Sequence, residues 1–315
     1  MILLKYTNSS LYGITTKKHL SYILKMNLGS LSNIEPLFCA NSFSKKKNNK
    51  SREFYNPTLE QRAVLNRINV ALCQIGAPNY AYGGIKGRSY IDNAKVHSGQ
   101  KALFLIDISN FFPSTRDKYV YKFFKNKLAM STDVATILTL VVTEKLFDSD
   151  KRFLPQGYPT SPLLSLFAYI EMFESINKIA INNDLKYTCY YDDLTLSSSS
   201  YIDKKILRQV KKEISSYDLK VNDFKTRALF NKASKLTGVV VSPEKIVAPG
   251  KLQLQMIDNF SKLMDAIYSG KMTTKIEINE LCNKVQGCLA SIKSIEPDRD
   301  LTYYVNKLKI IRQML

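Results

Sequence analysis

Residues 188–196 read Thr-Cys-Tyr-Tyr-Asp-Asp-Leu-Thr-Leu, two short strand-forming runs that meet at a pair of adjacent aspartates. Tyr and Thr favour the half-buried surface of a sheet, whereas Asp is depleted from strands. The pair Asp192-Asp193 therefore opposes local propensity, and such exceptions often mark functional sites. We interpret the stretch as a hairpin with catalytic carboxylates at its tip. The alternative is an ordinary Asp-Asp turn between exposed strands, since Asp is a common turn residue.

Adjacent carboxylates repel one another unless a cation lies between them. If a third carboxylate came within about 4 Å, each pairwise repulsion would be about 4 kcal/mol at an effective dielectric near 20. Carboxylate oxygens suit Mg²⁺, and two such ions roughly 4 Å apart are the usual arrangement for phosphoryl transfer in polymerases. The sequence thus predicts a site for two Mg²⁺ ions, provided that another segment supplies the third carboxylate.

The composition predicts a folded protein with a polyanionic partner. The 315 residues are 45% hydrophobic, and the net charge is +19 with a pI near 9.5. A basic surface attracts nucleic acid regardless of its sequence, whereas membrane binding needs an apolar or amphipathic anchor, which we do not find. No apolar run is long enough for a signal peptide or a membrane span, so we expect a cytoplasmic protein with no membrane partner. Five scattered cysteines without a CxxC pair predict neither zinc nor disulfides.

A buried strand that ends in a carboxylate is predicted upstream of the hairpin. Residues 102–106 form a continuous apolar run of strand length, which places Asp107 at the carboxyl end. Residues 236–241 read as another strand. Apolar residues recur at helical spacing in further segments, which we predict to be helices: 58–76, 115–129, 133–144, 163–180 and 203–217.

Three loops carry residue types that can bind anions. Residues 82–89 contain three glycines with Lys86 and Arg88, so the backbone could approach a phosphate, although an ordinary turn has the same composition. Residues 154–162 contain three prolines and one glycine and precede a helix, whose free N–H groups would face an anion. The basic run 45–52 and the residues after it read as a hairpin with positive charge at its turn, or else as a solvated loop.

Two further features stand outside these loops. Asn93 and His97 lie four residues apart and share a face if their segment is helical. On spacing alone, a lone His is more often a satisfied structural residue than a functional one. The C-terminal part has apolar residues at helical spacing over 252–267, 276–295 and 301–315, with lysines between them, and we expect these stripes to form a core.

In their order along the chain, these segments resemble the motifs of a reverse transcriptase. The motifs are Asp107, Pro155-Gln156-Gly157, Tyr190-Tyr191-Asp192-Asp193, Lys225 and Leu236-Thr237-Gly238. Within that family the chain is most similar to bacterial retron reverse transcriptases, whose Asn-Ala-x-x-His signature corresponds to residues 93–97. Their Val-Thr-Gly signature appears with Leu236 in place of Val, and Tyr191 stands where the family often has Ala.

The resemblance implies an α+β fold with the right-hand polymerase architecture, in which the palm is built on an antiparallel sheet. The resemblance covers residues 52–242. We accordingly expect an N-terminal helical extension over 1–44, fingers over 45–101, a palm with inserted finger elements over 102–242 and a helical thumb over 243–315.

The resemblance also implies residue roles. Asp107, Asp192 and Asp193 would be the catalytic metal ligands for two Mg²⁺ ions, and Lys225 would lie near the leaving pyrophosphate. Phe112 would lie under the sugar of the incoming dNTP, beside residues expected to line the nucleotide or the template, namely Gln156, Gly157, Arg88 and Lys86. Asn93 and His97 would contact RNA.

The family implies the partners as well. A retron enzyme copies part of a cognate structured non-coding RNA into single-stranded DNA, with priming from a 2′-hydroxyl that leaves a branched product. It acts in anti-phage defence with an effector, expected here to be a separate protein. A group II intron maturase is an alternative in the same class, although maturases usually carry additional regions. A catalytically silent RNA-binding scaffold is an alternative in another class, against which the intact aspartates and lysine argue.

Overall fold

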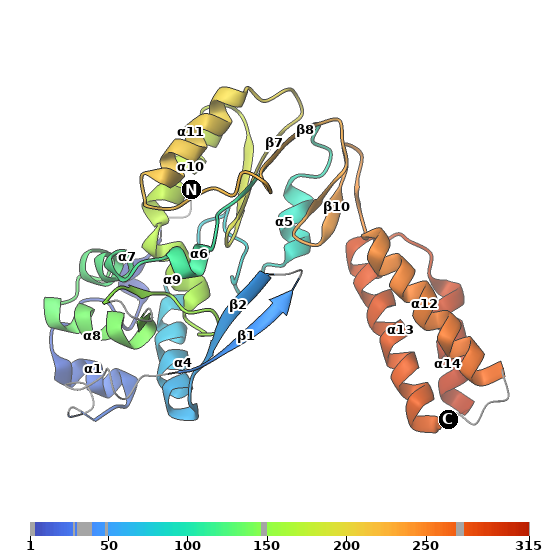
Figure 1. Ribbon diagram of the computed structural model, residues 1–315, viewed down its shortest axis with the longest axis horizontal. Helices are drawn as coiled ribbons and strands as arrows, with labels where there is room; N and C mark the ends of the chain where they lie inside the picture. The colour runs from blue at the N-terminus through green and yellow to red at the C-terminus, as the bar shows by residue number, and fades with distance from the viewer. Residues whose placement is uncertain are drawn as a thin grey trace. The chain divides into compact units, whose positions relative to one another are not determined.

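The computed structural model describes residues 4–27, 29, 40–47, 50–145, 150–268 and 274–314 (Figure 1). Helices and short strands alternate along the chain, which confirms a mixed helix and sheet fold. Its helices are η1 (Tyr6–Asn8), α1 (Lys17–Leu24), α4 (Leu59–Cys73), α5 (Tyr90–Val96), α6 (Phe111–Ser114), α7 (Asp117–Lys122), the π-helical η2 (Phe123–Lys127), α8 (Thr132–Val142), α9 (Ser161–Ala168), α10 (Ile170–Ile181), α11 (Lys204–Ser215), α12 (Gly250–Tyr268), α13 (Lys275–Ile295) and α14 (Thr302–Met314). Its strands are β1 (Asn41–Lys47), β2 (Lys50–Asn56), β3 (Ala102–Asp107), β4 (Glu144–Lys145), β5 (Arg152–Phe153), β6 (Lys186–Tyr190), β7 (Asp193–Ser198), β8 (Arg227–Phe230), β9 (Ser234–Leu236), β10 (Val239–Val241) and β11 (Ile246–Val247).

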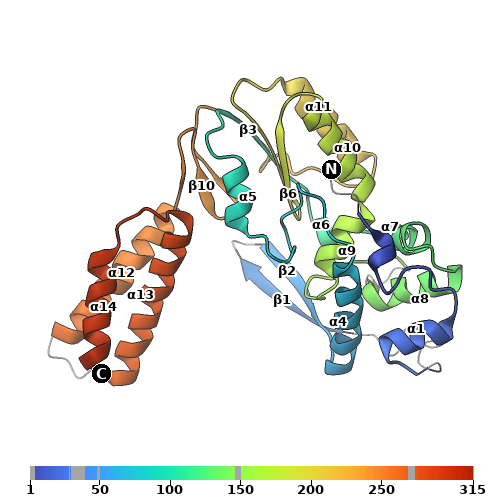
Figure 2. The same ribbon diagram turned by 180° about the vertical axis from the view of Figure 1, so that it is seen from behind.

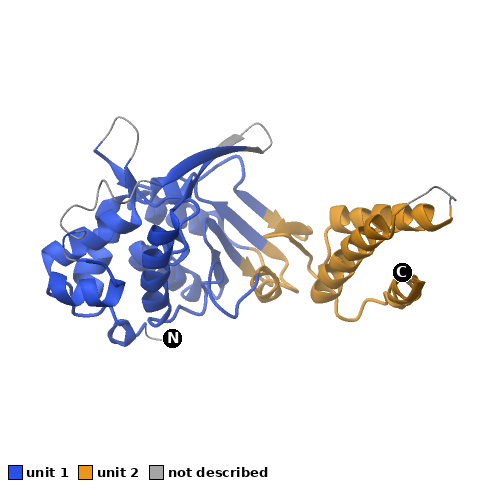
Figure 3. Ribbon diagram, turned by 90° about the horizontal axis from the view of Figure 1, so that it is seen from below, with its two compact units in different colours: residues 1–89, 103–196, 202–228 blue, residues 90–102, 197–201, 229–315 orange. Residues whose placement is uncertain are grey.

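The chain forms two compact units (Figure 3). The first contains residues 1–89, 103–196 and 202–228, and the second contains residues 90–102, 197–201 and 229–315. The segment 90–101, assigned to the fingers from the sequence, thus groups with C-terminal residues. The division into extension, fingers, palm and thumb remains a prediction.

Most of a four-stranded sheet lies in the first unit, with the strand order β6-β7-β3-β8. The predicted strand at 102–106 is β3, and its side chains Leu103, Phe104 and Ile106 are at most 3% exposed. The predicted hairpin is formed by β6 and β7. Helix α10 packs against β6 and lies beside α11 in both views (Figures 1 and 2). The sheet is therefore a rigid support for the residues at its strand ends.

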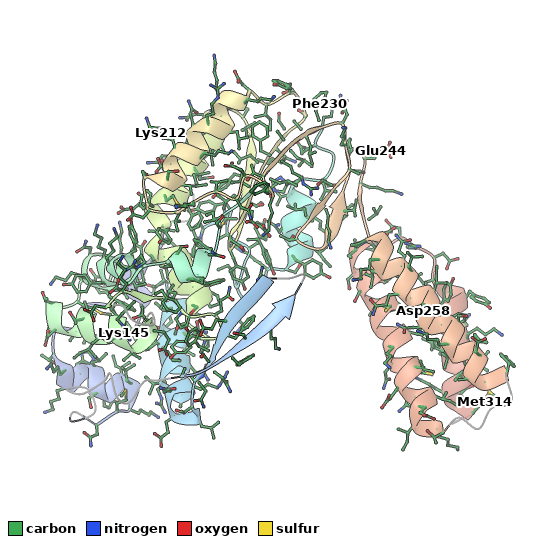
Figure 4. All side chains as sticks on the ribbon, in the orientation of Figure 1. Lys145, Lys212, Phe230, Glu244, Asp258 and Met314 are labelled. Carbon is green, nitrogen blue, oxygen red and sulfur yellow. The ribbon has the colours of Figure 1, made fainter. Side chains whose placement is uncertain are left out.

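Local sequence signals set the ends of several helices in the first unit. Thr58 and Gln61 form a reciprocal capping box at the start of α4, as expected from a Thr before the first apolar turn. Asp203 caps α11, which buries apolar residues on one face and exposes its lysines, including Lys212 (Figure 4). The basic run does form the hairpin β1–β2, with Asn41 opposite Asn56, although its turn at 48–49 lies outside the described residues.

Two helices predicted in the first unit depart from a single regular α-helix. The segment 163–180 is not one helix but α9 and α10, because the backbone of Tyr169 leaves the helical region at φ −114° and ψ 23°. The Tyr169 side chain is fully buried, and its ring lies 4.8 Å from that of Tyr119. The segment 115–129 is helical over 117–127 as predicted, but its hydrogen bonding changes from the α pattern in α7 to the π pattern in η2.

The second unit contains α5, a small antiparallel sheet and the three C-terminal helices. The sheet has the strand order β11-β10-β9, and α5 packs against β10. The predicted strand at 236–241 is in fact a hairpin, because Thr237 and Gly238 form a turn between β9 and β10.

Helices α12, α13 and α14 confirm the three predicted C-terminal helices. The expectation that the stripe on the first of them is wholly core was wrong. Met256 and Leu263 are buried, whereas Leu254 is 68% and Ile257 52% exposed. A stripe that is wider than the contact with α13 leaves its outer residues in solvent. Within the described ranges, no helix is both long and apolar enough to cross a bilayer.

Candidate active site

The three predicted aspartates come together where β3 ends beside the β6–β7 hairpin. Tyr191 and Asp192 form the hairpin turn, and Asp193 begins β7. The N–H of Ile108, directly after β3, donates to the carbonyl of Asp192 at 2.9 Å. The end of β3 therefore meets the start of β7, and Asp107, which is 7% exposed, is brought close to the two hairpin aspartates.

The pKa values of the two hairpin aspartates agree with the closeness of the three carboxyls. The pKa of Asp193 is raised to about 7, first because the carboxyl is buried and then because the charges of Asp192 and Asp107 oppose its ionisation. The pKa of Asp192 is also raised, chiefly by burial and further by Asp107. Positive charge from Lys225 acts in the opposite direction on both groups. The three carboxylates thus form one electrostatic unit that positive charge stabilises.

Lys225 supplies a positive charge directly to this cluster. Its Nζ donates to Oδ1 of Asp107, whose side chain is 9% exposed, whereas the Lys225 side chain is 49% exposed. The lysine sits on a turn that is anchored to the same strand end, because the N–H of Asn222 donates to the Asp107 carbonyl at 2.7 Å and the N–H of Lys225 donates to the Asn222 carbonyl. One end of the ion pair is therefore fixed, and the ammonium remains accessible to solvent.

The donor set of this cluster suits a hard divalent cation. Asp107, Asp192 and Asp193 offer only carboxylate oxygens, which Mg²⁺ prefers, and each of the two hairpin carboxyls is harder to ionise in the absence of a cation. Among the described residues, no three Asp, Glu, His or Cys side chains are placed so that they would hold a metal ion as they stand. The ammonium of Lys225 already contacts Asp107, where a cation would bind. The three carboxylates thus have the chemistry to bind a divalent cation, and such a cation would displace the Lys225 ammonium from Asp107.

A packed surface supports the hairpin from behind. The N–H of Cys189 donates to the Tyr80 carbonyl, and the N–H of Tyr82 donates back to the Cys189 carbonyl. A Cβ on Gly83 would lie 2.6 Å from the backbone nitrogen of Tyr191, and one on Gly84 would lie 3.0 Å from its ring. Two of the three glycines that suggested a phosphate-binding loop are therefore explained by close packing against the hairpin.

The basic residues of that glycine loop have different surroundings. Arg88 donates to the carbonyls of Pro78, Ala81 and Ala77, and its guanidinium lies 5.7 Å from the centre of the Tyr82 ring. These contacts tie the loop to the segment before it. Lys86 is exposed. Of the two residues predicted near template or nucleotide, only Lys86 thus has a side chain turned to solvent.

Phe111 and Phe112 are adjacent in the sequence but have different surroundings. They begin the short helix α6. Phe111 is 2% exposed and packs against the rings of Tyr169 and Phe173, whereas Phe112 is half-buried with its ring 5.9 Å from that of Tyr191. Phe112 therefore lies beside the turn of the β6–β7 hairpin, and Phe111 belongs to the core.

The loop with Gln156 and Gly157 is joined to the β1–β2 hairpin. The N–H of Tyr55 on β2 donates to the Gln156 carbonyl at 2.7 Å. Gly157 has φ +113°, and a Cβ there would collide with the Tyr55 carbonyl oxygen. Only glycine fits this position, because both the backbone angle and the close approach exclude a side chain.

Asn93 and His97, which were predicted to contact RNA, have buried side chains. Asn93 is 1% exposed, and its Nδ2 donates to Oγ1 of Thr237 at 3.2 Å. His97 is fully buried, and its Nδ1 lies 2.6 Å from Oγ of Ser197. Both side chains have protein partners in the second unit.

Sequence reasoning missed Arg52, which lies on β2 in the first unit. Its charge lowers the pKa of Asp192, so the guanidinium acts on the acidic cluster from the side of the β1–β2 hairpin. The basic run at 45–52 was the available signal. It does not reveal which of its residues turns toward the aspartates, because that depends on pairing between segments far apart in the sequence.

Comparisons with known proteins give consistent matches. A sequence model for the family described as "Reverse transcriptase (RNA-dependent DNA polymerase)" matches residues 44–246. The chain is 31% identical over 193 residues to the Retron Se72 reverse transcriptase of Salmonella heidelberg (strain 579083-10), which covers 60% of this chain and 49% of that protein. It is 30% identical over 266 residues to the Retron Ec86 reverse transcriptase of Escherichia coli, which covers 82% of this chain and 77% of that protein.

A third relative and one solved structure complete the comparison. The Retron Ec73 reverse transcriptase of Escherichia coli is 26% identical over 266 residues, covering 80% of this chain and 81% of that protein. A telomerase from Candida albicans, solved with a TWJ fragment of telomeric RNA, aligns with a TM-score of 0.47 and 13% identity over 86% of this chain and 57% of that chain, below the level that establishes a shared fold. This chain thus spans about half the length of the Salmonella relative and about three quarters of the Ec86 protein.

Proposed function

Since this chain belongs to the reverse transcriptase family, and within it to the retron type, we propose that it is an RNA-directed DNA polymerase. The observation that supports the proposal best is the grouping of Asp107, Asp192 and Asp193 at one end of the sheet, with Lys225 in contact with the first of them. Three grouped carboxylates, of which Asp192 and Asp193 have a raised pKa, next to a half-exposed ammonium, are suited to nucleotidyl transfer.

The three aspartates would hold two Mg²⁺ ions. When bound, the ions supply the positive charge that favours attack of a primer hydroxyl on the α-phosphate of a dNTP. With the cations held by the aspartates, Lys225 would leave Asp107, and its ammonium would lie near the leaving pyrophosphate, where it would neutralise charge or donate a proton. Its exposure of 49% supports such a movement, because an exposed lysine loses little when it changes position.

The nucleotide would lie between the hairpin turn and the β1–β2 hairpin, both of which belong to the first unit. Phe112 supports the sugar, while Gln156 and Gly157 line the base and Arg52 faces the triphosphate. The positive charge that Arg52 exerts on Asp192 supports this placement. Lys86 and Arg88 serve the template or triphosphate side, Lys86 through its exposed ammonium and Arg88 through the loop that it holds.

The retron relatives suggest the substrate. The enzyme copies part of a cognate structured non-coding RNA into single-stranded DNA, and a 2′-hydroxyl of that RNA serves as primer. We also propose that it works in the cytoplasm and in anti-phage defence with a separate effector protein. The net charge of +19 supports binding to a polyanionic RNA.

Sequencing of the nucleic acid that co-purifies with the protein tests the retron part of the proposal. We expect one predominant RNA joined covalently to DNA, so that ribonuclease digestion leaves DNA with a short RNA remnant. The Asp192→Asn variant should carry the same RNA without DNA. A mixture of unrelated cellular RNAs without attached DNA would contradict the retron assignment while leaving polymerase activity open to direct assay.

Metal binding can be measured without any turnover. Mg²⁺ at ten times its dissociation constant should stabilise the wild-type protein by about 1.4 kcal/mol, and EDTA should reverse the effect. We expect this rise in melting temperature to be lost in Asp107→Asn and kept in Asp258→Asn, which changes an exposed carboxylate on α12 (Figure 4). Equal Mg²⁺ responses in the two variants would argue against the acidic cluster as the metal site.

A further inference from the structure

The turn between β9 and β10 has an unusual residue for its backbone. Leu236 and Val239 pair directly, so Thr237 and Gly238 form a two-residue hairpin loop. Both have positive φ, +44° for Thr237 and +104° for Gly238. A loop with two left-handed residues normally carries Asn-Gly or Asp-Gly, because a β-branched residue such as Thr is strained there. Some other contact must therefore hold Thr237 in this conformation.

Helix α5 provides that contact from within the same unit. Nδ2 of Asn93 donates to Oγ1 of Thr237 at 3.2 Å, and Oγ1 of Thr237 donates in turn to the Tyr90 carbonyl at 3.4 Å. A Cβ on Gly238 would lie 3.7 Å from the Tyr90 ring, so the second loop residue also rests on the start of the helix. Helix and turn are thus joined by two hydrogen bonds, and the Tyr90 ring lies next to the position that a Cβ on Gly238 would take.

Asn93 is buried, and its main polar contact is the hydrogen bond to Thr237. The side chain is 1% exposed, and its Oδ1 is buried without a hydrogen-bond partner among the described residues. An amide that forgoes one of its hydrogen bonds is costly to bury, which indicates that the bond to Thr237 matters to the fold of the turn. Nothing in this geometry leaves the amide available to a nucleic acid.

We propose that Asn93 is a positioning residue that holds the Thr237-Gly238 turn in its left-handed form. In the proposed polymerase this turn, rather than Asn93, would face the template–primer duplex. The two motifs, Asn-Ala-x-x-His and Leu-Thr-Gly, then act together, because Asn93 of the first holds the turn formed by the second. Thr237 and Gly238 are partly exposed, and Lys235 is exposed on the adjoining strand, where its charge suits a phosphate backbone. The second half of the proposal rests on the proposed polymerase function.

A second substitution that restores duplex binding in an Asn93 variant distinguishes the positioning role from direct contact of Asn93 with nucleic acid. It also distinguishes that role from simple packing of Asn93 in the core. Asn93→Ala should loosen the turn and weaken binding of a labelled RNA–DNA duplex of arbitrary sequence about tenfold, as expected when one hydrogen bond is lost. Thr237→Asn creates the Asn-Gly loop, which is left-handed without help. The double variant Asn93→Ala/Thr237→Asn should therefore recover wild-type affinity to within about twofold.

Two further variants sharpen the comparison. Thr237→Val keeps the side-chain shape and removes the hydroxyl, so it should match Asn93→Ala, and the two combined should be no worse than either. Ser197→Ala removes a partner of His97 in the same unit, and Thr237→Asn should not rescue any defect that it causes. Absence of rescue in the Asn93→Ala background, or additive losses with Thr237→Val, would overturn the positioning role.

A readout without nucleic acid separates this proposal from the polymerase assignment. Hydrogen exchange of residues 234–241 in the free protein should accelerate in Asn93→Ala and return toward the wild-type rate in the double variant. Unchanged exchange in Asn93→Ala would overturn the positioning role whatever the enzyme does. If hydrogen exchange is rescued but the protein binds no RNA–DNA duplex, the contact between the turn and the duplex is overturned, and with it the proposed function. The positioning role of Asn93 would still stand.

Discussion

At the scale of single residues, the aspartates of the acidic cluster are buried in a place where their negative charge is unfavourable. The pKa values of Asp192 and Asp193 are both raised, because the carboxyls are desolvated and lie near other carboxylates. Such a group destabilises the free protein and favours a cation. The sequence could predict which aspartates take part, because a strand end and a hairpin tip are local features. It could not predict that Arg52 acts on Asp192 or that Asn93 is buried, since both depend on distant pairings.

Phe112 and Phe111 give a matched pair of variants. Phe112 is half-buried beside Tyr191, so Phe112→Ala should relax the space beneath the sugar and raise ribonucleotide incorporation relative to dNTP, by roughly 5- to 150-fold for 1 to 3 kcal/mol of lost steric selection. Phe111→Ala should leave sugar preference unchanged and cost about 3 to 5 kcal/mol of stability, because its ring is in the core.

Steady-state incorporation of matched dNTP and rNTP, together with urea unfolding, measures both effects. A Phe112→Ala enzyme that discriminates as well as the wild type would place the sugar gate elsewhere.

At the scale of elements, long-range strand contacts decide where the loops and strand ends around the acidic cluster lie. The loop at 156–157 is held by β2 through the Tyr55 N–H, and β3 reaches the hairpin through the Ile108 N–H. The elements themselves were largely predictable, because β3, α4 and the C-terminal helices have clear periodicity and caps. The break at Tyr169 and the turn at Thr237 were not predictable, since tertiary contacts override an apolar pattern that looks continuous.

Gly157 tests the junction between β2 and this loop. Gly157→Ala should destabilise the protein by about 2 to 4 kcal/mol, because an alanine would face both an unfavourable φ of +113° and a collision with the Tyr55 carbonyl oxygen. Gly87→Ala is the control, since Gly87 has φ +79° and no atom lies within 4 Å of the position that an alanine Cβ would take, and it should cost only about 1 kcal/mol. Urea denaturation of both variants measures the difference, and equal losses would show that the close approach to Tyr55 is not limiting.

At the scale of the whole molecule, the net charge of +19 is the dominant property. Phosphate contacts by Lys and Arg release counterions, so log affinity for RNA should fall linearly with log salt, with a slope of about −0.7 to −0.9 per phosphate contacted. Fluorescence anisotropy across a salt series measures this slope. A nearly flat dependence would mean that contacts other than phosphate neutralisation provide the affinity.

Charge and family membership indicate an RNA-directed DNA polymerase, and we propose that its activity depends on the acidic cluster. Asp192→Asn replaces one carboxylate oxygen by an amide NH₂ group and keeps the side-chain shape, so the fold should persist. Cation binding and nucleotidyl transfer should fail. The decisive measurement is Mg²⁺-dependent extension of a primer on an RNA template by the wild type and by Asp192→Asn, with matched melting curves as the check on folding. We expect DNA synthesis by the wild type and essentially none by the variant. Retention of more than a few per cent of wild-type activity by a folded Asp192→Asn protein would contradict the assignment of the catalytic site.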